Sequence, residues 1–184
     1  MAVEHREMVD LIRRGVPGPG GVWADLGAGT GNFTWALAEL LGPSATIHAL
    51  DRDGRAVEAQ RARLTHDPPA ATVLPRQADV LRPFELPPLD GVLLANLLHF
   101  VRDQHGLLRR LHNLVRPGGS LLVVEYEQTA PIPWVPYPLP LTRLATLVTE
   151  AGFTPAAQVG ARRSPSSGRL LYAAVANRPE GAAS

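Results

Sequence analysis

The chain has 184 residues, of which 45% are hydrophobic, and a formal net charge of +1. This size fits one domain with a substantial core, so a single domain over residues 1–184 is predicted. The absence of cysteine and lysine excludes disulfides, zinc–thiolate sites, cysteine nucleophiles and Schiff-base chemistry. Without a bilayer-length apolar run or a signal peptide, the sequence predicts a cytoplasmic protein with no membrane partner.

The chain begins with a predicted short helix over residues 3–15, followed by a glycine- and proline-rich linker that ends at residue 21. Together, residues 1–21 form a small N-terminal segment ahead of the first strand, Val22–Leu26. Short apolar residues run up to Leu26, and the later strand Gly91–Ala95 is apolar on both faces, as expected for a strand that is covered by helices on two sides.

A glycine-rich turn over residues 27–31 connects this strand to a predicted helix over Phe33–Leu41. Glycine lets backbone amides approach a ligand without interference from a Cβ atom. The start of the helix adds unpaired N–H groups that favour a carboxylate or a phosphate. The segment therefore predicts a nucleotide-type pocket.

The glycine spacing is G-x-G-x-G, because Asn32 stands where the dinucleotide fingerprint G-x-G-x-x-G has a glycine or another small residue. Asp25, two residues before the first glycine, is placed to accept a hydrogen bond from an ammonium or an amide. The turn therefore favours a ligand that carries an amino acid over a pyrophosphate.

Strands and helices continue to alternate along the chain. The further predicted strands are Thr46–Leu50, Thr72–Arg76, Gly91–Ala95, Ser120–Tyr126, Ala156–Ala161 and Arg169–Val175, and the further helices are Arg55–His66, Gln104–Val115 and Leu141–Ala151. The last two strands must pair antiparallel, because their connection is too short for a parallel crossover. Residues 177–184 are predicted to be a frayed tail.

These segments resemble the class I S-adenosylmethionine-dependent methyltransferases. Residues 25–31 are similar to the first motif of the family, and three later segments match in the expected order: 77–80 its adenine-contacting segment, 90–96 its fourth strand, and 114–124 its helix, Pro-Gly-Gly turn and fifth strand. The resemblance implies a Rossmann-like, doubly wound α/β fold. Its seven-stranded sheet would be mostly parallel, with an antiparallel C-terminal strand and helices on both faces. The implied cofactor is S-adenosylmethionine, with S-adenosylhomocysteine as its product.

The predicted cofactor residues gather at strand ends, where open α/β sheets bind their ligands. They are Asp25, Gly27, Ala28, Gly29, Gly31, Asn32, Asp51, Arg52, Asp79, Val80 and Asn96. Asp51 is placed to bind a ribose diol. Structural roles remain as alternatives: Asp51 as a helix cap, Asp79 as a turn cap, and Asn96 as a partner of local backbone.

Methyl transfer from a sulfonium is an in-line displacement, which requires alignment and exclusion of water but no obligatory acid or base. A hydroxyl or a carbon acid would still have to lose a proton. His99, just past the fourth strand, is the candidate base, since histidine exchanges protons near neutral pH. A purely structural histidine is the alternative, and Glu125, Tyr126 and Glu127 are the other nearby candidates.

Residues 127–140 form a proline-rich loop that is predicted to lie on the substrate side. Tyr126, Trp134 and Tyr137 are placed to wall an acceptor pocket, or instead to pack the loop onto the sheet. Asn96 lacks the Pro-Pro-aromatic continuation of enzymes that methylate nucleic-acid amines, and the arginines are scattered, so no nucleic-acid partner is expected. No carboxylate cluster suggests a divalent metal, and none is predicted.

The sequence therefore predicts S-adenosylmethionine-dependent methyl transfer to oxygen, nitrogen or carbon of a small molecule. A protein or ribosomal RNA methyltransferase and a non-catalytic cofactor-binding module remain as alternatives. An NAD-dependent oxidoreductase is disfavoured by Asn32, the Pro-Gly-Gly turn and the final hairpin. The short N-terminal segment leaves an open site, which suits a bulky acceptor, an acceptor presented by a partner, or a homodimer that closes it.

Overall fold

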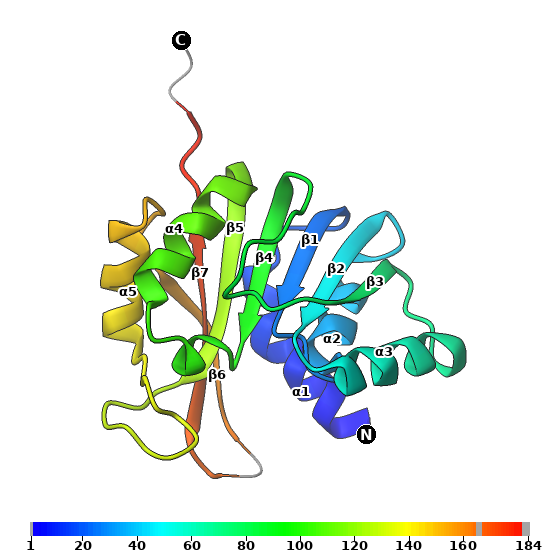
Figure 1. Ribbon diagram of the computed structural model, residues 1–184, viewed down its shortest axis with the longest axis horizontal. Coiled ribbons are helices and arrows are strands. Elements are labelled where there is room, and N and C mark those ends of the chain that lie inside the picture. Colours follow the sequence, from blue (N-terminus) through cyan, green and yellow to red (C-terminus); the bar gives the residue numbers. More distant parts are fainter. Residues whose placement is uncertain (1, 165–166, 182–184) are drawn as a thin grey trace.

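The computed structural model describes residues 2–164 and 167–181, and strands alternate with helices through most of this chain (Figure 1). The strands are β1 (Gly21–Leu26), β2 (Ala45–Asp51), β3 (Thr72–Gln77), β4 (Leu89–Ala95), β5 (Val115–Tyr126), β6 (Ala157–Arg163) and β7 (Leu170–Asn177). The helices are α1 (Ala2–Ile12), α2 (Asn32–Leu41), α3 (Gly54–His66), α4 (Gln104–Leu114) and α5 (Leu141–Glu150), with short 3-10 turns η1 (Arg13–Gly15) and η2 (Leu98–Phe100).

The seven strands form one sheet in the order β3-β2-β1-β4-β5-β7-β6. Strands β1 to β5 pair in parallel, whereas β7 runs antiparallel to both β5 and β6. The predicted α/β fold with an antiparallel C-terminal strand is confirmed. Because the strand order reverses between β1 and β4, the sheet has its topological switch point there, and ligands of such sheets bind beyond this point.

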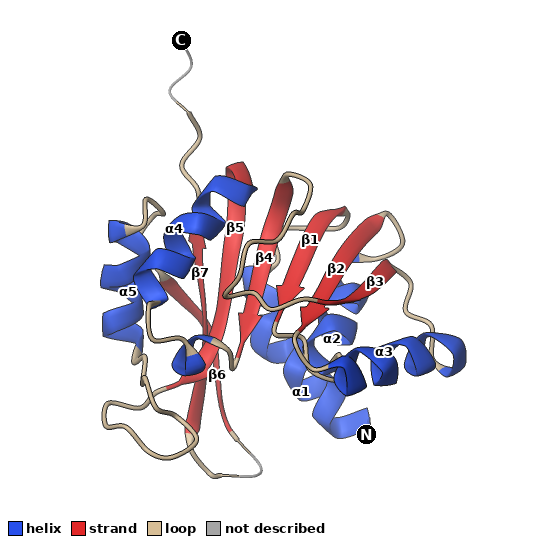
Figure 2. Cartoon of the chain, in the orientation of Figure 1, coloured by secondary structure: helices blue, strands red, loops and turns tan. Residues whose placement is uncertain are grey.

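Helices cover both faces of the sheet (Figure 2). In β4, Val92 and Leu94 belong to the core that α4 and α5 complete, whereas Leu93 and Ala95 belong to the core that α1 and α2 complete. Successive residues of a strand face opposite sides, so a strand with helices on both sides must be apolar throughout. The central strands are therefore fixed from both faces, and their carboxyl ends form a rigid edge.

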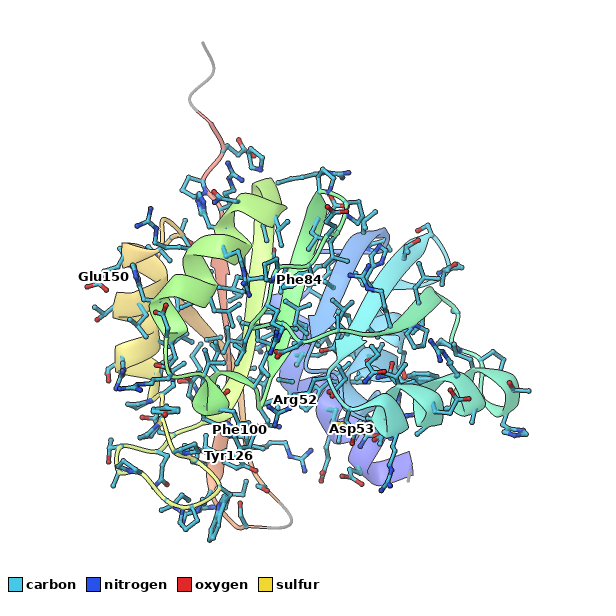
Figure 3. All side chains as sticks on the ribbon, viewed as in Figure 1. Arg52, Asp53, Phe84, Phe100, Tyr126 and Glu150 are labelled. Atoms are coloured by element: carbon cyan, nitrogen blue, oxygen red, sulfur yellow. The ribbon has the colours of Figure 1, made fainter. Side chains whose placement is uncertain are left out.

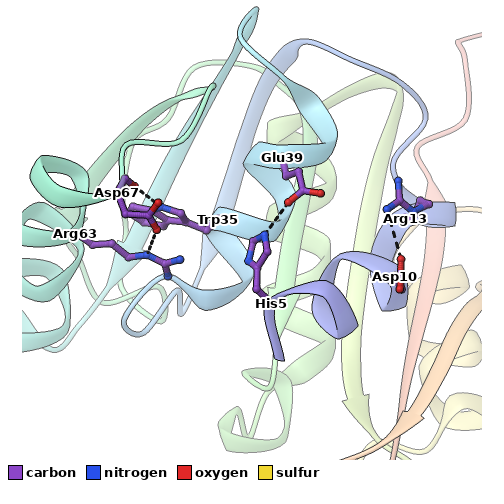
Figure 4. A network of polar contacts seen from close by, with 7 residues as sticks. All are labelled: His5, Asp10, Arg13, Trp35, Glu39, Arg63 and Asp67. Atoms are coloured by element: carbon purple, nitrogen blue, oxygen red, sulfur yellow. Dashed lines mark hydrogen bonds and ion pairs between the residues drawn. The ribbon is translucent and has the colours of Figure 1, made fainter. Parts of the chain in front are cut away.

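Polar contacts fix the helices around the start of α2 (Figure 4). His5 Nε2 lies 2.7 Å from Glu39 Oε2 and joins α1 to α2. The Trp35 indole N–H donates to the Asp67 carbonyl at 2.8 Å, and the Arg63 guanidinium lies 4.3 Å from the Trp35 ring while it pairs with the Asp67 carboxylate. These contacts hold α2 just behind the glycine-rich turn.

The structure corrects the sequence prediction near the C-terminus. β5 already begins at Val115, where the sequence predicts a helix end followed by a turn. Two pairings explain the difference: Val115 pairs with Leu89 of β4, and the Arg178 backbone exchanges 2.8 Å hydrogen bonds with Gly118 and Gly119. The predicted tail from residue 177 is therefore wrong at its start. Residues 165–166 of the hairpin turn and 182–184 of the tail lie outside the described residues.

Candidate functional site

A cleft of about 210 Å³ opens at the carboxyl ends of β1, β2 and β4, at the switch point of the sheet. Its lining includes six of the predicted cofactor residues: Gly27, Asp51, Arg52, Asp79, Val80 and Asn96. Ala78 of the expected adenine-contacting segment also lines the cleft, and the other lining residues were not singled out from the sequence: Leu81, Leu97, Phe100 and Val101. The remaining predicted residues lie in or beneath the adjoining glycine-rich turn. Figure 3 shows Arg52 and Phe100 near this edge.

The glycine-rich turn is tied to the end of β2, since the N–H groups of Gly27 and Ala28 donate to the Leu50 carbonyl at 2.8 and 3.0 Å. Its three glycines have φ angles of 74°, 54° and 87°, which side chains other than glycine rarely adopt. A Cβ atom on Gly29 would have no neighbour within 4 Å. The backbone of the turn therefore borders open space at this residue.

The helix that follows the turn begins without a side-chain cap. Gly31 is the N-cap of α2 in a left-handed conformation, and it supplies no side-chain acceptor. The first amides of a helix have no acceptor within that helix, and the helix dipole adds positive potential. Asn32 and its neighbours can therefore bind a carboxylate through their backbone N–H groups.

Two side chains hold the turn in place. Asp51 Oδ2 accepts from the Gly29 N–H at 2.7 Å, and Asp51 Oδ1 accepts from the Asp53 N–H at 2.8 Å. On the other side, the Gln60 amide donates to the Gly29 carbonyl at 2.6 Å. A carboxylate can accept about four hydrogen bonds, so Asp51 keeps acceptor capacity for a diol while it fixes the turn.

Asp25 lies beneath the turn and is only 1% exposed. Burial raises the pKa of its carboxyl to about 7; the hydrogen bond from Thr34 opposes this shift and the nearby Asp51 charge adds to it. The Thr34 hydroxyl donates to Oδ2 at 2.7 Å, whereas Oδ1 is buried and has no partner among the described residues. The cost of burying the ionised Asp25 carboxylate is thus not offset, and a neighbouring cation would offset it.

Asn96, at the end of β4, has a φ of 54° and is the only described residue other than glycine with a positive φ. Its N–H donates to the Val124 carbonyl at 2.9 Å, but its side-chain oxygen is buried without a partner in the described chain. Strained conformations and unpaired buried acceptors concentrate at functional sites. Asn96 therefore presents an acceptor to a ligand in the cleft.

The segment after β3 is held by side chains on both of its ends. Asp79 Oδ1 accepts from the Leu81 N–H at 2.9 Å, which is the turn-capping role that the sequence left as an alternative. Arg110 of α4 donates to the carbonyls of Val80 and Arg82, and its guanidinium lies 5.3 Å from the Phe84 ring. Arg110, which the sequence did not single out, thus fixes one wall of the cleft.

A buried histidine–carboxylate pair lies beside the cleft. His99 Nδ1 is 2.6 Å from Glu125 Oε2, and the two side chains are 3% and 1% exposed. The His99 backbone N–H adds a 3.3 Å bond to Glu125 Oε1. Because a carboxylate can only accept, Nδ1 carries the hydrogen, and Nε2 is left without a hydrogen-bond partner in the described chain.

The proline-rich loop meets this pair at its C-terminal end. The Tyr137 N–H donates to the His99 carbonyl at 3.0 Å, and the Gln104 amide donates to the Leu98 and Tyr137 carbonyls at 3.0 and 2.9 Å. The Tyr126 ring lies 5.9 Å from the His99 ring. Two of the predicted acceptor residues therefore adjoin His99, whereas the third, Trp134, is 56% exposed.

Comparison with known families identifies the chain. The sequence model of a family described as "Methyltransferase domain" matches residues 24–121, which is more than half of the chain. The chain belongs to this family. The predicted class I methyltransferase fold and its cofactor, S-adenosylmethionine, are confirmed.

Curated relatives of this methyltransferase domain are longer. One is the ubiquinone/menaquinone biosynthesis C-methyltransferase UbiE of Ectopseudomonas mendocina, which is 32% identical over 111 residues, or 60% of this chain and 43% of that protein. Another is the demethylmenaquinone methyltransferase of Lactococcus lactis, 28% identical over 59% of this chain and 43% of that protein. The chain thus spans about two fifths of the length of these relatives.

Solved structures share the fold of the domain. A SAM dependent methyltransferase from Aquifex aeolicus superimposes with a TM-score of 0.74 at 14% identity and covers 96% of this chain and 92% of that chain. The CurJ carbon methyltransferase gives a TM-score of 0.69 at 18% identity over 92% of this chain and 51% of that one. At these identities the similarity concerns the fold.

The cleft of the methyltransferase domain fits its cofactor. The open space over Gly29 and the uncapped start of α2 suit an amino-acid carboxylate, while the unpaired oxygen of Asn96 suits an N–H donor. Among the described residues, no group of three or more His, Asp or Glu side chains could hold a metal ion.

Proposed function

We propose that the domain methylates a small molecule at an oxygen or carbon that must first lose a proton. The observation that carries this proposal is the buried pair of His99 and Glu125 next to the cofactor cleft. When bound, S-adenosylmethionine supplies an electrophilic methyl group on a positively charged sulfur. The chain must therefore bind the two reactants in line, exclude water and remove the proton of the acceptor.

The cofactor is proposed to be held by the predicted residues around the cleft. The amides at the start of α2 bind its carboxylate, and Asp51 accepts from its ribose hydroxyls. Asn96 accepts from an amino group, and the segment around Asp79 and Val80 contacts the adenine. Burial raises the pKa of the Asp25 carboxyl to about 7, and a positively charged ligand at the turn would stabilise its carboxylate form.

His99 is proposed to act as the general base through Nε2. Glu125 accepts the Nδ1–H and so fixes the tautomer whose Nε2 carries the lone pair. When Nε2 takes the proton of the acceptor, the Glu125 carboxylate stabilises the imidazolium that forms. The pair is buried, so this stabilisation is weakly screened by solvent.

The acceptor is proposed to be a phenol or hydroquinone, as the names of the quinone-biosynthesis relatives suggest. Removing a phenolic proton raises the electron density on the oxygen and on the ring carbons ortho to it, so the same base prepares either atom for methylation. After methylation at carbon, that carbon loses its hydrogen as a proton and the oxygen regains one, which restores the aromatic ring. Tyr126, whose ring lies 5.9 Å from that of His99, and Tyr137, whose N–H donates to the His99 carbonyl, are proposed to contact the aromatic ring of the acceptor. Trp134 is proposed to contact a more distant part of the acceptor.

The test is transfer of a tritium-labelled methyl group from S-adenosylmethionine to a naphthohydroquinone acceptor. We expect label in the organic extract, and mass spectrometry of the product then locates the methyl group on carbon or oxygen. Label that reaches only RNA or protein would contradict the small-molecule proposal. Binding of S-adenosylhomocysteine without transfer to a panel of phenols or to a cell extract would indicate a non-catalytic module. Light scattering of the same sample tests the predicted homodimer.

A further inference from the structure

Large exposed hydrophobic side chains concentrate at one edge of the molecule. In the part of the chain that the structure describes, six such side chains are strongly exposed, and only Leu74, on β3, lies elsewhere. The other five lie at the carboxyl edge of the parallel strands, and we name them the apolar rim: Leu81, Phe100, Trp134, Tyr137 and Leu170. Exposed apolar side chains that occur singly need no explanation, whereas their concentration at one edge of a molecule indicates a contact surface.

The centre of the apolar rim is the proline-rich loop, which projects from this edge between β5 and α5 (Figure 1). Residues 128–140 contain five prolines and no charged side chain. Prolines restrict the backbone, and mutual backbone hydrogen bonds between Ile132 and Val135 close the tip. The loop is further anchored by the Tyr172 hydroxyl, which donates to the Leu139 carbonyl at 2.7 Å. It therefore presents Trp134 on an ordered backbone.

Positive charge flanks the loop. Arg102 precedes α4, and Arg163 and Arg169 lie at the two ends of the β6–β7 connection, which reaches the same edge (Figure 2). Arg102 and Arg163 are exposed and Arg169 is half-buried, and none of the three pairs with a carboxylate in the described chain. The carboxylates closest in sequence, Asp103 and Glu127, each accept a backbone N–H. The loop is thus flanked by three arginines and two carboxylates, and both carboxylates already accept a backbone hydrogen bond.

We propose that the apolar rim docks on the surface of an anionic lipid bilayer. Trp134 and Tyr137 would lie at the boundary of headgroups and acyl chains, the depth that these amphipathic rings favour, and the arginines would contact lipid phosphates. A narrow projecting loop suits a deformable apolar phase better than a second copy of the chain, whose interface requires about 800 Å² per partner.

This inference goes beyond the proposed function and revises the prediction of no membrane partner. That prediction rested on the lack of a spanning segment, and no helix in the described chain is long and apolar enough to cross a bilayer. Docking on the surface requires no such segment. Leu81 and Phe100 belong both to the rim and to the lining of the cofactor cleft, so docking would bring the mouth of the cleft to the lipid.

The test uses the full chain with vesicles of phosphatidylcholine alone and of an equal mixture with phosphatidylglycerol. We expect flotation with the mixed vesicles and a blue shift of tryptophan emission. The shift reports on Trp134, because Trp23 and Trp35 are only 1% and 4% exposed. Trp134→Ser should weaken partitioning about tenfold through lost apolar burial. Arg102→Gln and Arg163→Gln should each weaken it about fivefold. The matched control, Leu74→Ser, removes an exposed leucine outside the rim and should leave partitioning unchanged.

Three results would overturn the proposal: no binding to mixed vesicles, equal binding by Trp134→Ser, or a blue-shifted Trp134 in a vesicle-free dimer detected by light scattering. The last result would assign the rim to contact between two copies. Vesicle binding requires no methyl transfer, so failure of the proposed function would leave this readout intact.

Discussion

The two halves of the carboxyl edge are built in different ways. Around β1 and β2, the hydrogen bonds that shape the cofactor cleft involve backbone groups. Asp51 accepts from the Gly29 N–H, and Gln60 donates to the Gly29 carbonyl. Around β4 and β5, the acceptor half depends on side chains from separate elements, above all His99 and Glu125, which are 26 residues apart.

This difference assigns different tasks to the two halves. A backbone turn fixes a ligand that is the same in every reaction cycle, and it tolerates little variation in sequence. Side chains and a loop can change without disturbing the sheet, and in the proposed function they set what receives the methyl group. Substitutions on one side should affect cofactor affinity, and substitutions on the other should affect turnover or acceptor affinity.

The largest effect on cofactor binding is expected from Gly29→Ala. Its Cβ would occupy the open space over the turn and strain a residue with a φ of 54°, so affinity for S-adenosylhomocysteine should fall about a hundredfold. Gly168→Ala is the matched control, because Gly168 has a φ of 66° and equally open surroundings but lies in the hairpin. Calorimetry should show normal affinity for this control; equal losses in both variants would contradict the assignment of the turn.

On the acceptor side, Gln104→Leu should raise the KM of the acceptor about tenfold and leave S-adenosylhomocysteine affinity unchanged. The substitution leaves the Tyr137 carbonyl unpaired and removes one of the hydrogen bonds that the Leu98 carbonyl accepts. It thereby loosens the loop against the turn that carries His99, at a stability cost of about 2 kcal/mol. Ser120→Ala removes another buried polar contact far from this edge and should lower stability alone. If Gln104→Leu also weakened the affinity for S-adenosylhomocysteine, this would contradict the assignment of separate tasks to the two halves.

A third prediction concerns Asp25, on the cofactor side, and the dependence of stability on pH. Because burial raises its pKa to about 7 from the ordinary 3.8, the folded protein binds more protons than the unfolded chain between these values. Stability should therefore fall as pH rises from about 4 to 7, by on the order of 1.4 kcal/mol per pH unit, and then level off. Asp25→Asn, which retains an acceptor for Thr34, should lack this slope in denaturant titrations. A slope equal to that of the wild type would contradict the assignment.

The sequence predicts the cofactor half well, because its signals are local. The glycine-rich turn, the carboxylate that ends β2 and the polar residue that ends β4 are each visible within a few positions, and strand ends meet at one edge of a parallel sheet. The additional bonds of Asp51 to Gly29 and of Arg110 to Val80 were missed, since they join distant segments.

The acceptor half is less predictable for the same reason. His99 could be singled out, but its pairing with Glu125 depends on the register between β4 and β5 and on η2, a three-residue turn without a clear sequence signal. The early start of β5 depends on Arg178, which is more than sixty positions further along the chain. The apolar rim likewise cannot be recognised in the sequence, because it forms only where the fold brings the proline-rich loop next to the adjoining ends of β6 and β7.

The most direct test of the account measures both halves in one variant, His99→Asn. The asparagine amide can still donate to Glu125 but offers no basic nitrogen. We predict an unchanged dissociation constant for S-adenosylhomocysteine and a decrease in methyl transfer of about a hundredfold to ten-thousandfold. Wild-type turnover in this variant, with the phenolic acceptor that the native domain methylates, would contradict the account.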